Sequence, residues 1–343
     1  MKLESLIDVK PYSLKRNKKT TLLNEMLFNL TKYHYENCLE YKYLLDSMDF
    51  KIENRSTYVN IPFLPVRLFK MFDLISVPRD SIFKTMTSSG TTGQSVSKIF
   101  LDKKTSLNQS KVLTKIVSSF LGSKRTPMLI IDSDQVLKNR NMFSARGAGI
   151  LGFSIFGKKK IFALDKNMKL KIDEISQFLD KHKDEKMFLF GFTFMIYKHF
   201  LQEIIKNKIN FNLSNATLIH GGGWKKLEKN RVSSKDFRSM LKNLCGINFV
   251  HDYYGMVEQT GSIFMECEYG FLHSSLFADV IIRRAYDFSE APFKEAGIIQ
   301  TLSVLPKSYP GHSLLTEDEG IIFGEDDCKC GRYGKYFKIL GRI

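Results

Sequence analysis

Met128-Leu129-Ile130-Ile131-Asp132 is a short apolar run that ends on a carboxylate. Runs of this length and composition are typical of strands buried on both faces. Similar runs occur at 187–190, 216–219 and 247–250, and helical spacing of apolar residues covers 172–179 and 194–205. Strands that alternate with helices predict a mostly parallel sheet flanked by helices, which is an α/β fold.

The spacing of apolar residues changes on both sides of this α/β core. Apolar residues at three- and four-residue spacing predict helix over 20–50. Short apolar runs at 298–302 and 320–323 predict strands joined by turns. We therefore expect a helical N-terminal region at 1–80, an α/β nucleotide- and acyl-binding core at 81–265, and a β-rich subdomain at 266–343.

Composition excludes several protein classes. Among 343 residues, 43% are hydrophobic, which is enough for a sizeable core and excludes a disordered chain. No apolar run reaches the roughly 18 residues that span a bilayer, and the Lys-rich N-terminus lacks a signal-peptide core. Five cysteines favour a reducing, cytoplasmic location. The net charge of +16 indicates either an anionic partner or a solvated Lys-rich surface.

The segment Thr87-Ser88-Ser89-Gly90-Thr91-Thr92-Gly93, followed by Lys98, predicts a phosphate-binding loop. Its glycines let the backbone approach a ligand closely, and its N–H and hydroxyl groups are donors to phosphate oxygens. The spacing differs from the G-x-x-x-x-G-K-[ST] pattern, which disfavours P-loop kinase or GTPase chemistry.

A second glycine motif, His220-Gly221-Gly222-Gly223-Trp224, follows a predicted strand. Such loops form the oxyanion hole of some hydrolases, but no G-x-S-x-G nucleophile motif follows it here. Glycines at the carboxyl end of a strand also suit a flat ring that lies against the backbone, such as adenine.

Three later motifs carry acidic or basic groups. In His251-Asp252-Tyr253-Tyr254-Gly255-Met256-Val257-Glu258, the tyrosines suit base stacking and Glu258 is a candidate oxygen ligand for Mg²⁺. In Leu315-Thr316-Glu317-Asp318-Glu319-Gly320, an acidic group in a turn suits ribose hydroxyls. The last motif is Ile339-Leu340-Gly341-Arg342-Ile343.

In this order the motifs resemble the adenylate-forming superfamily of acyl-CoA synthetases, firefly luciferase and peptide-synthetase adenylation domains. The segment at 87–93 looks like its phosphate loop, and 221–223 looks like its adenine-side glycine loop. The segment at 254–258 is similar to its aromatic-G-x-T-E motif, with Val257 where Thr is usual. Asp318 matches its ribose-binding Asp, and Gly341-Arg342 matches its hinge-entry G-R.

A closer resemblance is to the acyl-protein synthetase of the fatty-acid reductase of luminous bacteria and to phenylacetate-CoA-ligase-like enzymes. Three segments carry it: Pro62-Phe63-Leu64-Pro65-Val66 running into Phe69-Lys70, Ser144-Ala145-Arg146-Gly147-Ala148-Gly149, and Cys328-Lys329-Cys330-Gly331-Arg332. The resemblance implies that a carboxylic acid and ATP give an acyl-adenylate and pyrophosphate. The acyl group then goes to a thiol or amine, with coenzyme A or a reductase-like protein partner as open choices.

The resemblance also implies roles for individual residues. Lys98 and the 87–93 loop would hold the β- and γ-phosphates, and Glu258 would hold magnesium. Tyr253, Tyr254, Gly255 and the three glycines at 221–223 would flank adenine, while Asp318 and Arg342 would hold ribose. The superfamily continues past the G-R hinge with a lid that carries a catalytic Lys, and the luminous-bacteria synthetase has a tail with an acylated Cys. Because this sequence ends one residue after Arg342, we expect a missing or truncated lid and slow adenylation without a partner.

Four soft metal ligands fall in the last part of the chain: Cys267, His273, Cys328 and Cys330. Three thiolates and an imidazole are a tetrahedral zinc set. The segment from Cys267 to His273 resembles phenylacetate-CoA-ligase relatives, some of which hold zinc there. The alternatives are structural Zn²⁺ and reduced thiols that never meet.

The acid itself is predicted to be apolar. Phe188, Phe190, Phe192 and Phe194 alternate around Gly191, which fits either an acyl tunnel or a buried strand. Alternative functions remain at this stage: an acyl-CoA ligase, a nucleic-acid-binding module that explains the charge, or an inactive nucleotide-binding scaffold.

Overall fold

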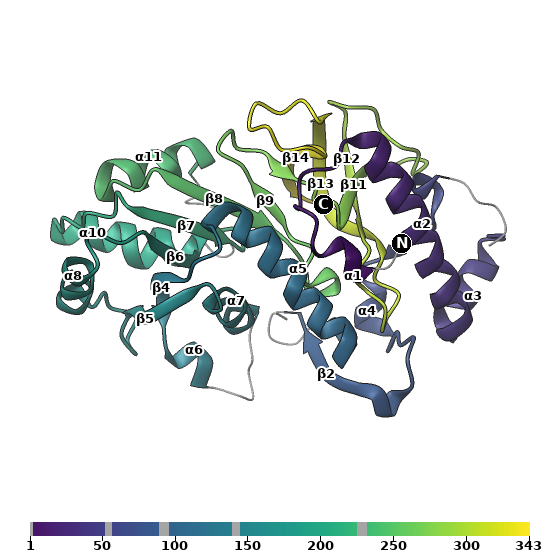
Figure 1. Ribbon diagram of the computed structural model, residues 1–343, viewed down its shortest axis with the longest axis horizontal. Helices are drawn as coiled ribbons and strands as arrows, with labels where there is room; N and C mark the ends of the chain where they lie inside the picture. The colour runs from purple at the N-terminus through teal and green to yellow at the C-terminus, as the bar shows by residue number, and fades with distance from the viewer. Residues whose placement is uncertain (1–2, 52–56, 89–95, 139–144, 225–231) are drawn as a thin grey trace. The chain divides into compact units, whose positions relative to one another are not determined.

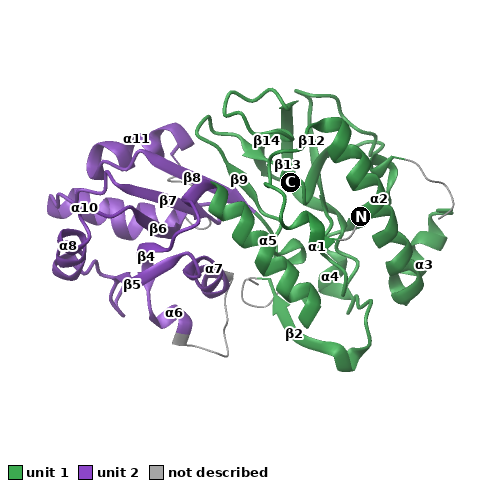
Figure 2. Ribbon diagram, in the orientation of Figure 1, with its two compact units in different colours: residues 1–119, 255–343 green, residues 120–254 purple. Residues whose placement is uncertain are grey.

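The computed structural model describes residues 3–51, 57–88, 96–138, 145–224 and 232–343 (Figure 1). The chain divides into two compact units (Figure 2). Unit 1 combines residues 1–119 with 255–343, and unit 2 is the continuous segment 120–254. Each unit is described by itself below.

Unit 2 is a parallel sheet flanked by helices, as the alternating pattern predicts. Its strand order is β5-β4-β6-β7-β8, and every neighbouring pair is parallel. The strands are β4 (Thr126–Ser133), β5 (Gly157–Leu164), β6 (Met187–Phe192), β7 (Ala216–Gly221) and β8 (Phe249–Tyr254). Because β4 lies between β5 and β6, the strand order reverses beside β4, and the carboxyl ends around such a point are the usual ligand-binding edge of an α/β sheet.

Helices pack on both faces of this sheet. Phe153 of α7 stacks on Phe190 of β6 with ring centroids 4.4 Å apart. On the opposite face, Phe237 of α11 meets His220 of β7 at 5.1 Å. The helices of unit 2 are α6 (Gln135–Lys138), α7 (Ala145–Ser154), α8 (Ile172–Lys181), α9 (Thr193–Met195), a π-helical turn (Ile196–Leu201), α10 (Gln202–Asn207) and α11 (Ser234–Cys245).

Unit 1 holds an antiparallel sheet in the order β11-β12-β13-β14-β10-β9, and β1 adds a parallel pairing to β13. The strands are β1 (Leu64–Pro65), β9 (Phe264–Glu266), β10 (Leu272–His273), β11 (Ala278–Arg283), β12 (Ala296–Ser303), β13 (Ser313–Glu325) and β14 (Lys335–Arg342). A separate ribbon pairs β2 (Ile82–Thr87) with β3 (Lys98–Asp102). The predicted strand at 320–323 is thus the end of a longer strand.

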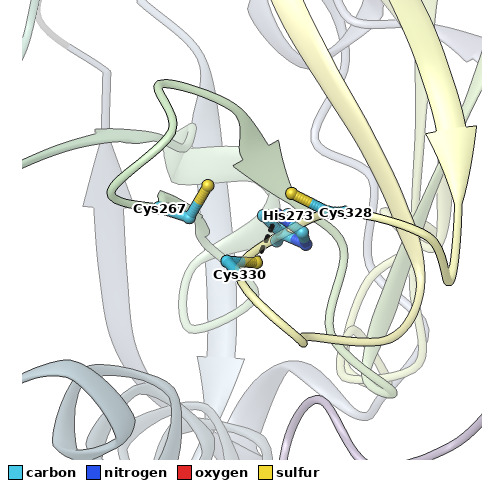
Figure 3. Close-up of side chains that lie close together, drawn as sticks. All are labelled: Cys267, His273, Cys328 and Cys330. Carbon is cyan, nitrogen blue, oxygen red and sulfur yellow. Dashed lines mark hydrogen bonds between the residues drawn. The ribbon is translucent and has the colours of Figure 1, made fainter.

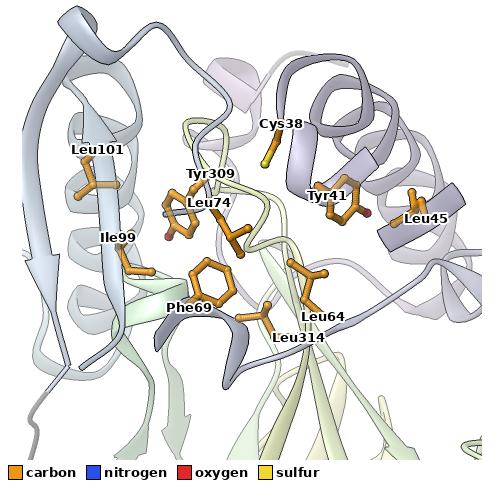
Figure 4. Packing of buried hydrophobic residues seen from close by; sticks show 10 residues of the cluster. All are labelled: Cys38, Tyr41, Leu45, Leu64, Phe69, Leu74, Ile99, Leu101, Tyr309 and Leu314. Atoms are coloured by element: carbon orange, nitrogen blue, oxygen red, sulfur yellow. The ribbon is translucent and has the colours of Figure 1, made fainter. Parts of the chain in front are cut away.

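The helices of unit 1 come mainly from the start of the chain. They are α1 (Leu3–Leu6), α2 (Arg16–Asn37), α3 (Leu39–Ser47), α4 (Leu68–Met71) and α5 (Lys103–Leu121), with 3₁₀ turns at Tyr58–Asn60, Arg79–Ser81 and Val257–Gln259. The helix predicted over 20–50 is broken at Cys38, whose backbone is extended at φ −130°. The break lets Tyr41 and Leu45 of α3 enter a core cluster with Phe69, Tyr309 and Leu314 (Figure 4).

The units differ from the predicted segments 1–80, 81–265 and 266–343. The N-terminal helices and the C-terminal sheet form one unit because their contacts are long-range. Lys19 of α2 donates to Asp279 of β11 at 3.1 Å, and Leu64 pairs with Leu314. Local composition cannot reveal such a discontinuous unit.

Candidate active site

Glu258 lies in the 3₁₀ turn Val257–Gln259 of unit 1 and is only 5% exposed. Burial raises the pKa of its carboxyl, while the neighbouring Ser97 hydroxyl and the Lys70 charge act in the opposite direction. Ser97 Oγ is buried, and apart from this interaction with the Glu258 carboxyl it has no hydrogen-bond partner in the part of the chain that is described. A buried carboxylate beside an unsatisfied hydroxyl oxygen fits a hard cation such as Mg²⁺, which prefers oxygen ligands.

The backbone of Glu258 is held in place by two buried groups. Tyr309 donates its hydroxyl proton to the Glu258 carbonyl at 2.9 Å, and Gln259 Nε2 donates to the carbonyls of Thr301 and Gly311. All of these groups belong to unit 1. The backbone around Glu258 is therefore held by β12 and by the segment that joins β12 to β13.

The first two residues of the predicted phosphate-binding segment, Thr87 and Ser88, lie at the end of β2. Thr87 pairs with Lys98 across the ribbon, and Ser88 accepts from Ser97 N at 2.9 Å through its hydroxyl. Ser88 thus extends the contact between the two strands by one further hydrogen bond. Ser89, Gly90, Thr91, Thr92 and Gly93 lie outside the described residues. Lys98 has a side chain 53% exposed and a contact of 3.8 Å to Asp73, a weak pair that an anionic ligand can replace.

Asp318 and Arg342 are direct neighbours in the β13–β14 register. The guanidinium of Arg342, however, donates to Glu317 at 2.5 Å. Arg67 donates to the same carboxylate at 3.0 Å. The pKa of Glu317 is lowered first by its hydrogen bond to Arg342 and then, against a burial effect, by Arg67. Glu317 and Arg67 are members of this site that the sequence analysis missed.

The three glycines at 221–223 in unit 2 have different environments. A Cβ on Gly221 would lie 2.6 Å from the Tyr253 ring, and one on Gly222, whose φ is +81°, would lie 2.5 Å from the Phe192 ring. For Gly223, whose φ is +61°, no atom of the described residues lies within 4 Å of where its Cβ would be. Two of the glycines therefore admit aromatic rings of the protein itself, and Gly223 is the one that leaves room for an external ring.

The aromatic and histidine side chains near these glycines have structural partners. The Tyr253 ring also packs 5.0 Å from Phe153. Burial lowers the pKa of His220 to about 3, so the ring is neutral, and its Nδ1 lies 3.0 Å from the Thr193 hydroxyl. Adenine binding by Tyr253, by the half-buried Tyr254 and by Gly255, where a Cβ would meet Ile263 at 2.8 Å, stays a prediction.

The four predicted zinc ligands converge in unit 1 (Figure 3). One ligand atom from each of Cys267, His273, Cys328 and Cys330 lies within 4.8 Å of the others. Cys267 directly follows β9, His273 is the last residue of β10, and the other two come from the segment between β13 and β14. Of the two readings that the sequence left open, the structure excludes thiols that never meet.

The chemistry of this cluster fits a metal. Cys330 Sγ lies 3.3 Å from His273 Nε2. Hydrogen bonds from Cys267 and His273 hold the pKa of the Cys330 thiol low, which favours a thiolate ligand. Tetrahedral zinc with Zn–S bonds of about 2.3 Å needs sulfur atoms roughly 4 Å apart, which a cluster of this size provides. A Cys₃His set closed by four protein ligands is typical of a structural site.

The phenylalanines of β6 belong to the core of unit 2. Phe188 and Phe190 are at most 1% exposed, Phe192 is 5% exposed, and all six residues of β6 are buried. This arrangement matches the buried-strand reading. Phe194, in α9, is half-buried.

Comparison with known proteins completes this description. Residues 2–343 match the family described as acyl-protein synthetase, LuxE. The chain belongs to this family. A relative from Aliivibrio fischeri, described as a long-chain-fatty-acid–luciferin-component ligase, is 24% identical over 301 residues, which make up 84% of this chain and 76% of that protein. The LuxE match confirms the predicted resemblance and the prediction of an AMP-forming acyl-protein synthetase.

Solved structures of adenylate-forming ligases share the fold of this LuxE-family chain. An open conformation of 2-hydroxyisobutyryl-CoA ligase with 2-HIB-AMP and CoA has a TM-score of 0.73 at 15% identity, covering 97% of this chain and 76% of that one. A long-chain-fatty-acid-CoA ligase from Archaeoglobus fulgidus has a TM-score of 0.53 at 11% identity, covering 78% of this chain and 52% of that one. The predicted adenylate-forming α/β fold is thereby confirmed. No helix in the described ranges is long and apolar enough to cross a membrane.

Proposed function

We propose that this LuxE-family chain activates a long, apolar carboxylic acid with ATP and magnesium, and that it passes the acyl group to a protein thiol. The observation that carries the nucleotide part is the buried Glu258 carboxylate beside the buried Ser97 hydroxyl and close to Lys70. The named activity of the Aliivibrio fischeri relative supports a long-chain fatty acid as the substrate. The acceptor is proposed from the family, whose members are acyl-protein synthetases.

The chemistry requires the acid carboxylate to attack a phosphorus atom that is itself surrounded by negative oxygens. When bound, Mg²⁺ supplies charge neutralisation at those oxygens. Glu258 would hold the ion, Ser88 and Lys98 would flank the β- and γ-phosphates, and Asp318 and Arg342 would contact ribose. For unit 2 by itself, the family resemblance supports Gly223 and the half-buried Tyr254 as candidates for contact with an adenine ring. Fixed donors of this kind act most strongly where water is excluded.

We further propose that Cys267, His273, Cys328 and Cys330 hold a structural Zn²⁺. The ion would cross-link the β9–β10 hairpin to the turn between β13 and β14, two segments that are about sixty residues apart in the sequence. Closed Cys₃His sites contribute to folding and take no part in catalysis.

The test is pyrophosphate release from ATP and Mg²⁺ with straight-chain fatty acids of increasing length, with and without hydroxylamine as acyl trap. We expect acid-dependent release that falls at least about a hundredfold in Glu258→Gln, the usual scale for removing a group that stabilises a transition state. Glu36→Gln is the matched control, because Glu36 is an exposed glutamate that only makes a 3.9 Å surface pair with Lys32.

Two results would contradict the proposal. If no acid caused the release of pyrophosphate, the proposed acid-activating function would be rejected. Equal release by Glu258→Gln and the wild type would remove Glu258 from the magnesium site. Adding coenzyme A in parallel separates the acceptors, since a soluble acyl-CoA product would favour an acyl-CoA ligase over transfer to a protein.

A further inference from the structure

The segment that leads into α4 pairs with the first residues of β13. This is the strand that carries Glu317 and Asp318. Leu64 and Pro65 pair in parallel with Leu314 and Leu315, and Val66 N then donates to the Leu315 carbonyl at 2.9 Å. This pairing fixes the segment beside Glu317 and Asp318. Its next turn, α4, carries Lys70.

Phe69, the residue before Lys70, is anchored in the core of unit 1. Phe69 is 1% exposed and meets the Tyr309 ring edge-on at 6.1 Å (Figure 4). Tyr309 in turn donates to the Glu258 carbonyl. The Phe69–Tyr309 contact therefore links the helix that carries Lys70 to the backbone of Glu258.

The Lys70 charge acts on two carboxyl groups. It opposes the burial that raises the pKa of Glu258, and it adds to the lowering of the Glu317 pKa that Arg342 mainly causes. Yet no ion pair of 4 Å or less within the described ranges involves Lys70. The other cations at this end are engaged: Arg67 and Arg342 bind Glu317, and Lys98 contacts Asp73. The half-buried Lys70 ammonium can therefore bind a ligand without giving up a carboxylate partner, whereas the other three cations would have to exchange theirs.

We propose that Lys70 binds the α-phosphate of ATP and stabilises it during adenylation. This assignment rests on the proposed function, because it uses the roles given there to the two acidic positions. The segment that ends in Lys70 pairs with β13 just before the Glu317–Asp318 segment, the ribose position. Through Phe69 and Tyr309 the same segment packs against Glu258, the magnesium position. In a nucleotide, the phosphate that joins ribose to the magnesium-bound phosphates is the α-phosphate.

The step balances without any proton transfer from Lys70. A carboxylate oxygen of the acid attacks the α-phosphorus and forms the new O–P bond. The bond from that phosphorus to the oxygen bridging the α- and β-phosphates breaks, and its electron pair leaves with pyrophosphate. Lys70 stays protonated and offsets the charge that accumulates on the non-bridging oxygens.

Binding of AMP and of adenosine provides a test that needs no turnover, because the two ligands differ only in the α-phosphate. We expect the wild type to bind AMP more tightly than adenosine, and Lys70→Met to lose about ten- to a hundredfold in AMP affinity with adenosine affinity unchanged. Lys84→Met is the control, since Lys84 is an exposed lysine on β2 of the same unit. Lys70→Arg should keep part of the difference.

A second measurement separates a direct role from a structural one. In pyrophosphate release, Lys70→Ala should lose mainly kcat, and added ethylamine should restore part of it, while the thermal midpoint stays at the wild-type value. Equal AMP and adenosine affinities in the wild type would overturn the assignment whatever the pyrophosphate assay shows. Undiminished AMP binding by Lys70→Met would also overturn it. A third outcome separates the two proposals. If the wild type releases no pyrophosphate but prefers AMP in a way that depends on Lys70, the proposed reaction is rejected and the α-phosphate contact is kept.

Discussion

Where β14 begins, at Lys335, the charged groups of unit 1 are buried, whereas those where β14 ends, at Arg342, are largely exposed. At the first end, Asp279 is completely buried and receives Lys19 and Lys335, both at 3.1 Å, and the Tyr58 hydroxyl at 2.6 Å. At the second end, Glu317 is 24% exposed, and its partner Arg342 is 70% exposed.

The difference shows how one pair of strands can serve stability at one end and binding at the other. A buried carboxylate is stable only when every charge around it is matched, so its partners are fixed. Exposed pairs contribute roughly 0–1 kcal/mol and exchange partners at little cost. The end with Glu317 can therefore release cations to an anionic ligand, while the end with Asp279 cannot.

The largest expected effect comes from Asp279→Asn. Removing this carboxylate leaves Lys19 and Lys335 buried without their counter-charge, and breaking such a pair costs about 3–5 kcal/mol of unfolding free energy. Urea unfolding at neutral pH measures the loss. Asp80→Asn, at an exposed position of the same unit, should change stability by less than about 0.5 kcal/mol. If Asp279→Asn lowered the free energy of unfolding by less than about 1 kcal/mol, the charges at the Asp279 end would matter no more for stability than those at the Glu317 end.

The next largest effect is expected at the proposed zinc site, which lies near Lys335, at the same end of β14 as Asp279. We expect one zinc per chain by elemental analysis, lost in Cys328→Ser and kept in Cys245→Ser, whose thiol is buried in unit 2. Free zinc at about a hundred times its dissociation constant should stabilise the metal-depleted protein by about 2.7 kcal/mol. Purified protein that contains no zinc and does not respond to it in thermal unfolding would refute the metal site.

Acidification should affect the two ends in different pH ranges. His34 and His312, which directly precedes β13, are fully buried with rings stacked at 5.0 Å. Burial lowers the pKa of His34 to about 3 and that of His312 well below its usual value. Since unfolded histidine titrates near 6.5, only the unfolded state takes up protons just below that pH. Each histidine then costs up to about 1.4 kcal/mol of stability per pH unit.

Asp279 titrates in the opposite sense, because its carboxyl pKa is lowered by Lys19 and Lys335 against the effect of burial. Its contribution is therefore present above the unfolded value of about 4 and is lost only below it. Unfolding free energies measured from neutral pH down to about pH 4.5 should show the histidine slope alone. The slope should be shallower by up to about 1.4 kcal/mol per pH unit in His312→Gln. An unchanged slope in that variant would show that His312 does not cause the early loss.

Local patterns in the sequence were sufficient for features that depend on neighbouring residues. Buried strands such as Thr126–Ser133 and Met187–Phe192 follow from apolar runs, because a strand covered on both faces must be apolar throughout. The Cys and His residues of the metal cluster could be found because soft ligands are few in this chain. The glycines at 221–223 were recognised as a place of close approach, although the structure shows that two of the approaching rings belong to the protein.

Only the tertiary structure decided which charges meet. Lys70, Asp279 and Glu317 are ordinary residues in their local sequence, and each interacts with at least one charged group more than 180 residues away. A pattern of neighbouring residues indicates the period of a helix or strand. It does not distinguish a lysine that forms a buried ion pair from a lysine that can bind a phosphate. The difference arises from burial and from the sign of the distant partner, because the energy of a charge depends on the water and counter-charge around it.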